Sequence, residues 1–161
     1  MPHNVATAVI VLSLIAFTGP QAGRTAAPDA CPVTTPNHHS LGIVPESADW
    51  HANDGIGTEL WPGGKVVFRP GGAGQILSDG SLQMKFLWAK PLGEMSIEGK
   101  RLDAEAALLR SQLAPSHNAD PFQPSYLIFP TPGCWEVTAR VGDSRLTFVT
   151  EVMKTERTGQ P

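Results

Sequence analysis

The two cysteines are the residues of this chain that could form a covalent cross-link, and they lie far apart in the sequence. Cys31 opens the segment CPVT, and Cys134 stands beside Trp135 in the segment PTPGCWEVTA. A reactive thiol needs a nearby base that lowers its pKa, and no histidine lies close to Cys134 in the sequence. We therefore predict a structural Cys31–Cys134 disulfide, which would join an N-terminal arm to the last strands of the domain.

Histidines near the N-terminus are the side chains that could ligate a metal ion. His38 and His39 are adjacent, and the sequence DWHAND places Asp49 close to His51. Imidazole and carboxylate groups are suitable ligands for divalent metals. Adjacent histidines in a loop cannot both bind one ion unless the backbone bends, and the spacings His-x-His and His-Glu-x-x-His do not occur. We predict solvated loop residues here, with a small exported metal-binding protein as the alternative.

Two of the four tryptophans lie beside predicted loops. Trp50 and Trp61 could form an exposed aromatic platform that binds a sugar or a partner protein. The alternative, which we favour, is that both residues cover the edge of the core beneath the proline-rich arm. Trp50 and Trp61 therefore remain a possible binding surface.

Sequence patterns typical of catalysis or cofactor binding are absent. The chain has no Gly-x-Ser-x-Gly nucleophile elbow, and its glycine-rich stretches RPGGAGQ and WPGGK lack the Gly-Lys-Ser/Thr ending of a phosphate-binding loop. The formal net charge of -3 provides no basic surface for nucleic acid. We therefore predict that the protein is not an enzyme, takes no cofactor and binds no nucleic acid.

The chain begins with an apolar segment typical of export signals. Residues 5–17, VATAVIVLSLIAF, carry no charge, and small residues follow them. This run is shorter than the roughly 20 residues that a membrane-spanning helix needs. We predict a signal peptide that is cleaved after Ala22 or Ala27, and lipidation of Cys31 is the less favoured alternative. The mature protein is then expected outside the cytoplasm, either secreted or associated with the cell envelope.

Short stretches of alternating polar and apolar residues fill most of the remaining chain, and glycine (16) and proline (15) separate them. Such alternation is typical of half-buried strands, which we predict at residues 65–69, 82–88, 93–102, 125–129, 134–141 and 145–152. Gly142 and Asp143 would form the turn of the final hairpin. These strands predict an all-β domain, an antiparallel β-sandwich of immunoglobulin-like character, with a small barrel as the alternative.

One segment favours a helix instead. Residues 103–113, DAEAALLRSQL, combine good helix formers with Asp103 as an N-cap and Glu105 in the first turn. We therefore predict one short helix there, ending before Pro115. The predicted organisation is a signal peptide (1–27), a proline-rich arm (28–48), a β-sandwich (49–153) and a C-terminal tail (154–161).

The chain resembles a family of uncharacterised exported bacterial proteins. The resemblance rests on Cys31-Pro32-Val33-Thr34, Leu60-Trp61, Arg101-Leu102-Asp103 and the closing hairpin with PTPGCWEVTA. It covers most of the mature chain, and the hairpin is also similar to the last two strands of many immunoglobulin-like domains. The resemblance implies no catalytic residues. We predict an exported, non-catalytic β-sandwich that binds a partner protein or a component of the cell envelope.

Overall fold

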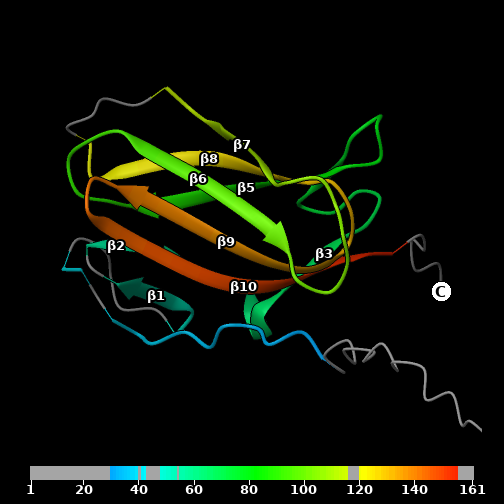
Figure 1. The fold of residues 1–161 in the computed structure, drawn as a ribbon, viewed down its shortest axis with the longest axis horizontal. Coiled ribbons are helices and arrows are strands. Elements are labelled where there is room, and N and C mark those ends of the chain that lie inside the picture. The colour runs from blue at the N-terminus through cyan, green and yellow to red at the C-terminus, as the bar shows by residue number, and fades with distance from the viewer. Residues whose placement is uncertain (1–29, 40, 43–47, 54, 116–119, 156–161) are drawn as a thin grey trace, which may run out of the picture.

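Two β-sheets pack face to face in the computed structural model, which describes residues 30–39, 41–42, 48–53, 55–115 and 120–155 (Figure 1). The predicted signal peptide (1–27) and residues 156–161 of the predicted tail lie outside the described residues. The elements in chain order are β1 (Trp50–Asn53), β2 (Ile56–Glu59), the 3-10 turn η1 (Pro62–Gly64), β3 (Lys65–Phe68), β4 (Gln75–Ile76), β5 (Leu82–Ala89), β6 (Met95–Arg101), β7 (Arg110–Leu113), β8 (Phe122–Phe129), β9 (Gly133–Val141) and β10 (Ser144–Lys154).

The first sheet contains six strands, in the order β1-β2-β5-β8-β7, with β4 paired to β5. Its central pair is antiparallel and runs from Leu82 opposite Phe129 to Ala89 opposite Phe122. Strand β2 pairs with one end of β5 and β4 with the other end, so neither covers the middle of β5 on that side.

The second sheet has the order β3-β10-β9-β6. Strand β10 pairs antiparallel with β9 over the whole length of β9, and Gly142 turns this hairpin with a positive φ of 55°. Strand β3 pairs with the end of β10 in parallel, which alternation within single strands could not reveal. The predicted antiparallel β-sandwich is therefore confirmed, with one parallel pair at the edge of the second sheet.

The core lies between the two inner faces and follows the predicted alternation. Trp135, Val137 and Ala139 of β9 are fully buried. Leu146 and Phe148 of β10 pair with Ala139 and Val137 and are buried on the same inner face. The other members of this core cluster are Ile56, Leu60, Val66, Phe68, Leu82, Phe86, Trp88, Met95, Leu109, Leu127, Phe129, Val141 and Val152. Burial of this apolar area is the main stabilising contribution to the fold.

The predicted helix over residues 103–113 is wrong. Residues 103–109 form bends and extended chain, and the remaining residues form β7, which pairs with β8. Leu109 explains the difference, because its side chain is buried over Gly99 and its N–H donates to the Gly99 carbonyl (3.0 Å). A short helix is marginal in water, so strand pairing and the burial of Leu109 override the helix propensity.

The hairpin of β1 and β2 lies at the start of the predicted β-sandwich (49–153), before residue 65, where the first strand is predicted. Its pairing runs from Trp50 opposite Glu59 to Asn53 opposite Ile56. The sequence does carry a signal for this hairpin, because Asp-Gly follows Asn53 and is a preferred two-residue turn. Strand β1 alternates over only four residues, with Trp50 and Ala52 buried, whereas the first three residues of β2 are all buried.

Candidate functional site

The Cys31–Cys134 disulfide is present and joins residues 103 positions apart in the sequence. Cys134 is only 3% exposed, although alternation places it on the outer face of β9, because the N-terminal arm covers it. The described part of the chain contains no free cysteine. The predicted structural pairing is therefore confirmed, and neither sulfur is available as a nucleophile in this oxidised form.

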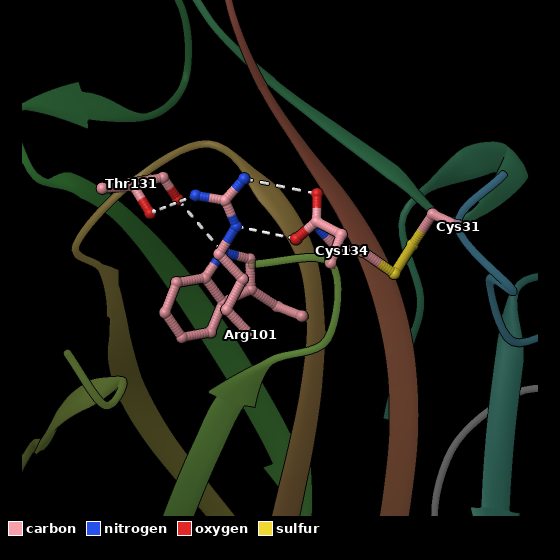
Figure 2. Close-up of polar contacts among 6 residues, drawn as sticks. Cys31, Arg101, Thr131 and Cys134 are labelled. Carbon is pink, nitrogen blue, oxygen red and sulfur yellow. Dashed lines mark hydrogen bonds and ion pairs between the residues drawn. A yellow bond between two sulfur atoms is a disulfide. The ribbon is translucent and has the colours of Figure 1, made fainter. Parts of the chain in front are cut away.

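A network of polar contacts surrounds the disulfide and centres on Arg101 (Figure 2). The guanidinium of Arg101 donates to both carboxylate oxygens of Asp103, from Nε at 2.7 Å and from Nη2 at 3.3 Å. Its Nη1 donates to Thr131 Oγ1 (3.2 Å), and Asp103 Oδ1 also accepts the Cys134 N–H (3.1 Å). The hydrogen bond from Arg101 lowers the pKa of Asp103, so this carboxylate stays ionised at neutral pH.

Four residues of the motif PTPGCW take part in this cluster: Thr131, Gly133, Cys134 and Trp135. Gly133 has a φ of 146°, and a Cβ at this position would overlap the guanidinium of Arg101. The Trp135 Nε1–H donates to the Thr131 carbonyl (3.0 Å), which fixes the turn before β9. The motif that contains the cysteine beside a tryptophan is thus a structural cluster around Cys134.

Trp50 does not form an exposed platform, because it is only 7% exposed. It packs with Ala52 and Ala89 on the outer face of the first sheet, where Leu41 of the arm and Phe122 complete a small second cluster. This finding corrects the platform prediction and confirms the alternative that Trp50 lies beneath the arm.

Trp61 is partly buried and packs against the main core instead of pairing with Trp50. Its ring centroid lies 4.8 Å from that of Phe86 and 6.3 Å from that of Phe148. Since the two tryptophans belong to different clusters, the predicted joint surface is wrong for this pair.

The histidines and Asp49 are not brought together as a metal site. Within residues 30–39, 41–42, 48–53, 55–115 and 120–155, no group of three or more His, Cys, Asp or Glu side chains could hold an ion. His38 and His39 are exposed, and the His38 N–H donates to the Trp50 carbonyl (2.9 Å). The geometry therefore does not support the metal-binding alternative.

A strip of apolar side chains, of which two are exposed and one is partly buried, crosses the outer face of the first sheet, and we call it the outer strip. It consists of Leu87 on β5 and Pro124 and Tyr126 on β8. Leu87 lies directly opposite Pro124, and Tyr126 lies opposite Lys85 two pairs further along, on the same face. Leu87 is 51% and Tyr126 40% exposed, and contiguous exposed apolar patches mark interaction sites more than single exposed side chains do.

A cavity of about 450 Å³ opens beside this strip, where β2 diverges from β5. Leu60 and Trp61 line one side of it, and Lys85, Phe86 and Leu87 line the other. Its size matches that of small ligand sites, and Trp61 and Phe86 in its lining offer aromatic contacts beside the carboxylates of Asp49 and Glu59. Alternation already points Leu87 away from the core face of Leu82, Met84 and Phe86, so the sequence contained this signal.

Neither the protein-family models nor the curated proteins identify a relative for this chain. No family model matches it. A search of curated proteins gives no significant match. Within the described residues, no helix has the length and apolar character needed to cross a membrane. The function of this chain is therefore inferred from the geometry of the outer strip and of the disulfide cluster.

His51 provides a pH-dependent contribution to stability. Partial burial lowers its pKa below 6.5, and its buried Nδ1 has no hydrogen-bond partner among the described residues. Asn37, Asn53, Arg145, Leu146 and Thr147 surround the same cavity, and Arg145 brings a positive charge to it. Protonation of His51 is therefore unfavourable in the folded state.

We expect the free energy of unfolding to decrease as the pH falls from 7.5 through 6.5 and then through the lowered pKa of folded His51. The unfolded chain binds the proton first, so the stability from neutral His51 is complete above 6.5 and is lost on acidification. The slope should be well below the roughly 1.4 kcal/mol per pH unit of a fully buried site, because His51 is only partly buried. Urea unfolding of the wild type and His51→Gln measures it, and equal slopes for both proteins would contradict this assignment.

Proposed function

We propose that this chain is an exported, non-catalytic β-sandwich domain that binds a partner protein of the cell envelope or its surroundings. The observation that carries the proposal is the outer strip, where Leu87 and Tyr126 expose apolar surface on a regular sheet face. The adjacent cavity with Trp61 in its wall offers a place for an apolar anchor residue of the partner. Such a central pocket with a polar rim is typical of protein interfaces.

The immunoglobulin-like part of the proposal is supported by the order of the strands. The order β2-β5-β8-β7 faces the order β3-β10-β9-β6, and this arrangement corresponds to the two sheets of an immunoglobulin-like sandwich. The parallel pair of β3 and β10 corresponds to a first strand that divides between the two sheets.

Export is supported by two independent observations. The apolar residues 5–17 have the length of a signal-peptide core, and the Cys31–Cys134 disulfide is stable in an oxidising compartment. The segments around Cys31 and Cys134 are also those that resemble exported bacterial proteins. A non-catalytic role is supported by the cluster around Arg101, where the polar groups of the motif bind one another.

The proposal is tested by capture from the native envelope fraction with purified mature protein as bait. Replacement of Leu87 by Asp places a charge in the centre of the outer strip and should reduce capture of the bound partner by about tenfold or more. The intact mass of the exported bait shows whether cleavage follows Ala22 or Ala27. Quantitative mass spectrometry of cross-linked material measures the capture.

Leu92→Asp is the matched control, because Leu92 is 72% exposed but lies in the loop after β5, outside the outer strip. Its capture should equal that of the wild type. Equal capture by Leu87→Asp and wild type, or an equal loss in both variants, would refute the outer strip as the binding surface. Recovery of the uncleaved chain from the cytoplasm alone would refute export.

A further inference from the structure

A cavity of about 390 Å³ lies between β1 and the first half of β10, and we call it the Arg145 cavity. Strand β3 pairs with the other end of β10, whereas β1 of the first sheet lies beside the part that precedes it (Figure 1). The two strands belong to different sheets, so the cavity lies where the edges of the two sheets meet. Its lining residues are Asn37, His51, Asn53, Arg145, Leu146 and Thr147.

His51 contributes a polar atom that no described residue satisfies. Trp50 and Ala52 are buried on one face of β1, so alternation places His51 and Asn53 together on the other face, which lines the cavity. The Nδ1 atom of His51 is buried and makes no hydrogen bond with a described residue. Because a buried polar atom without a partner costs free energy, a ligand that supplies this partner is favoured here.

Arg145 supplies the charge of the cavity. Its Nε donates to Thr147 Oγ1 (3.3 Å), and within the described residues it forms no ion pair. Glu98 and Glu136 share a neighbouring cavity with Arg145, but each of them is already in an ion pair with another basic side chain on β9 or β6. The described residues that line the Arg145 cavity include no acidic side chain. The guanidinium is therefore available to an anion.

We propose that the Arg145 cavity binds the carboxylate group of a small organic acid or of a peptide C-terminus. The planar guanidinium of an arginine can donate two parallel hydrogen bonds to a carboxylate. One positive charge among neutral polar groups suits a singly charged anion better than a phosphate group, which carries nearly two negative charges. The volume of the cavity lies within the range of small-ligand sites, and Leu146 adds apolar surface for the rest of the ligand.

This site is separate from the outer strip. The Arg145 cavity shares no lining residue with the cavity beside Leu87. The inference therefore goes beyond the proposed binding of a partner protein and does not depend on it.

A bound carboxylate changes the titration of His51. In the free protein, burial lowers the pKa of His51. Arg145 is the charged group that faces the cavity from β10, while β2 places Thr58 opposite His51 and the arm contributes Asn37. A carboxylate that accepts a hydrogen bond from the Nδ1–H group favours the protonated imidazole and raises the pKa of His51. By linkage, the carboxylate should bind more tightly as the pH falls toward the lowered pKa of free His51.

The test is an NMR titration of heavy-nitrogen-labelled mature protein, in which sodium acetate or sodium N-acetylglycinate replaces sodium chloride at constant ionic strength. N-acetylglycinamide, which lacks the carboxylate, is the control ligand. With both carboxylates we expect saturable shifts of the resonances of His51, Asn53 and Leu146, together with a higher pKa of His51 at saturation. The amide should leave these resonances unchanged. The absence of saturable shifts with both carboxylates, or equal shifts with the amide, would overturn the proposal.

The two carboxylates also distinguish the two sources of the ligand. N-acetylglycinate has the chemistry of a peptide C-terminus, whereas acetate is a free acid without a peptide group. Binding of N-acetylglycinate that is tighter by about tenfold or more would identify the C-terminus of a peptide as the ligand. Equal binding of the two would identify a small organic acid.

Two arginine variants test the role of the charge. Arg145→Gln removes the guanidinium and should weaken acetate binding by about tenfold or more. Arg140→Gln is the matched control, because Arg140 is also exposed and lies opposite Arg145 on β9, but it does not line the cavity. Its affinity for acetate should equal that of the wild type. Equal affinities of Arg145→Gln and wild type, or an equal loss in both variants, would show that the carboxylate does not bind at Arg145.

His51→Gln tests the link between binding and pH. Glutamine keeps a hydrogen-bond donor but does not titrate, so acetate should still bind and its affinity should no longer change with pH. An unchanged pH dependence in this variant would refute the contact with His51. None of these results depends on binding at the outer strip, so this proposal can fail while the proposed function stands.

Discussion

Replacing Cys31 and Cys134 together by serine is expected to lower the free energy of unfolding by about 4–5 kcal/mol. The disulfide closes a loop with a sequence separation of 103, and its loss restores conformational freedom to the unfolded chain. This is a large share of the roughly 5–15 kcal/mol that stabilises typical domains. Guanidinium unfolding followed by tryptophan fluorescence measures the change, because four tryptophans report on the sandwich.

The reduced wild type provides the control for this prediction. Reductant should destabilise the wild type by the same amount as the double substitution and should leave the Cys31→Ser/Cys134→Ser variant unchanged. A loss below about 1 kcal/mol would contradict the prediction and would mean that loop closure contributes little to stability. Thiol labelling under denaturing conditions should detect no free thiol before reduction and two after it.

Replacing Gly133 by alanine is expected to destabilise the protein by about 3 kcal/mol. The backbone at Gly133 has a φ of 146°, which side chains rarely adopt, and the new methyl group would overlap the Arg101 guanidinium. The substitution should therefore strain the chain and displace Arg101 from Asp103. Urea unfolding gives the change in stability, and thermal unfolding gives an independent measure of it.

Gly142→Ala is the matched control, since Gly142 also has a positive φ of 55° but nothing lies within 4 Å of its Cβ position. It should cost only about 1–2 kcal/mol from backbone strain. When Arg101 is first replaced by alanine, Gly133→Ala should become less costly by about 1 kcal/mol, because the overlap is gone. An unchanged cost in that background would refute steric conflict with Arg101 as the cause.

Alternation predicted the strands whose two faces differ in environment. In β5, Leu82, Phe86 and Trp88 are buried on the core side while Lys85 and Leu87 are exposed. The pairing of Cys31 with Cys134 was also predictable, since a chain with two cysteines allows only one disulfide within the chain. The strands of the second sheet, β3, β6, β9 and β10, could be predicted in the same way, because one face of each packs on the core.

Tertiary contacts explain what the sequence did not reveal. The segment after Asp103 has the composition of a helix, yet Leu109 is buried over Gly99 and the next residues pair with β8. Trp50 is buried on the outer face, because Leu41 covers it from a distant part of the chain. Neither contact has a local pattern, so propensity and periodicity could not predict them.

The diagonal positions of Leu87 and Tyr126 in the outer strip show both the use and the limit of such patterns. Alternation places each side chain on the outer face, but only the register of β5 and β8 places them beside each other. The cavity next to Leu87 exists because β2 leaves β5 after Thr58, whose Oγ1 donates to the Leu87 carbonyl (2.8 Å). This divergence leaves no mark in the sequence.

The parallel pairing of β3 with the end of β10 determines when this fold can be completed during synthesis. Lys65 lies opposite Glu151, so β3 cannot pair with β10 until almost the whole chain has been synthesised. At roughly 5–20 residues per second, Cys134 also follows Cys31 by about 5–20 s. The second sheet therefore assembles only as the last hairpin emerges, and an earlier end of translation would leave both the sheet and the first thiol without partners.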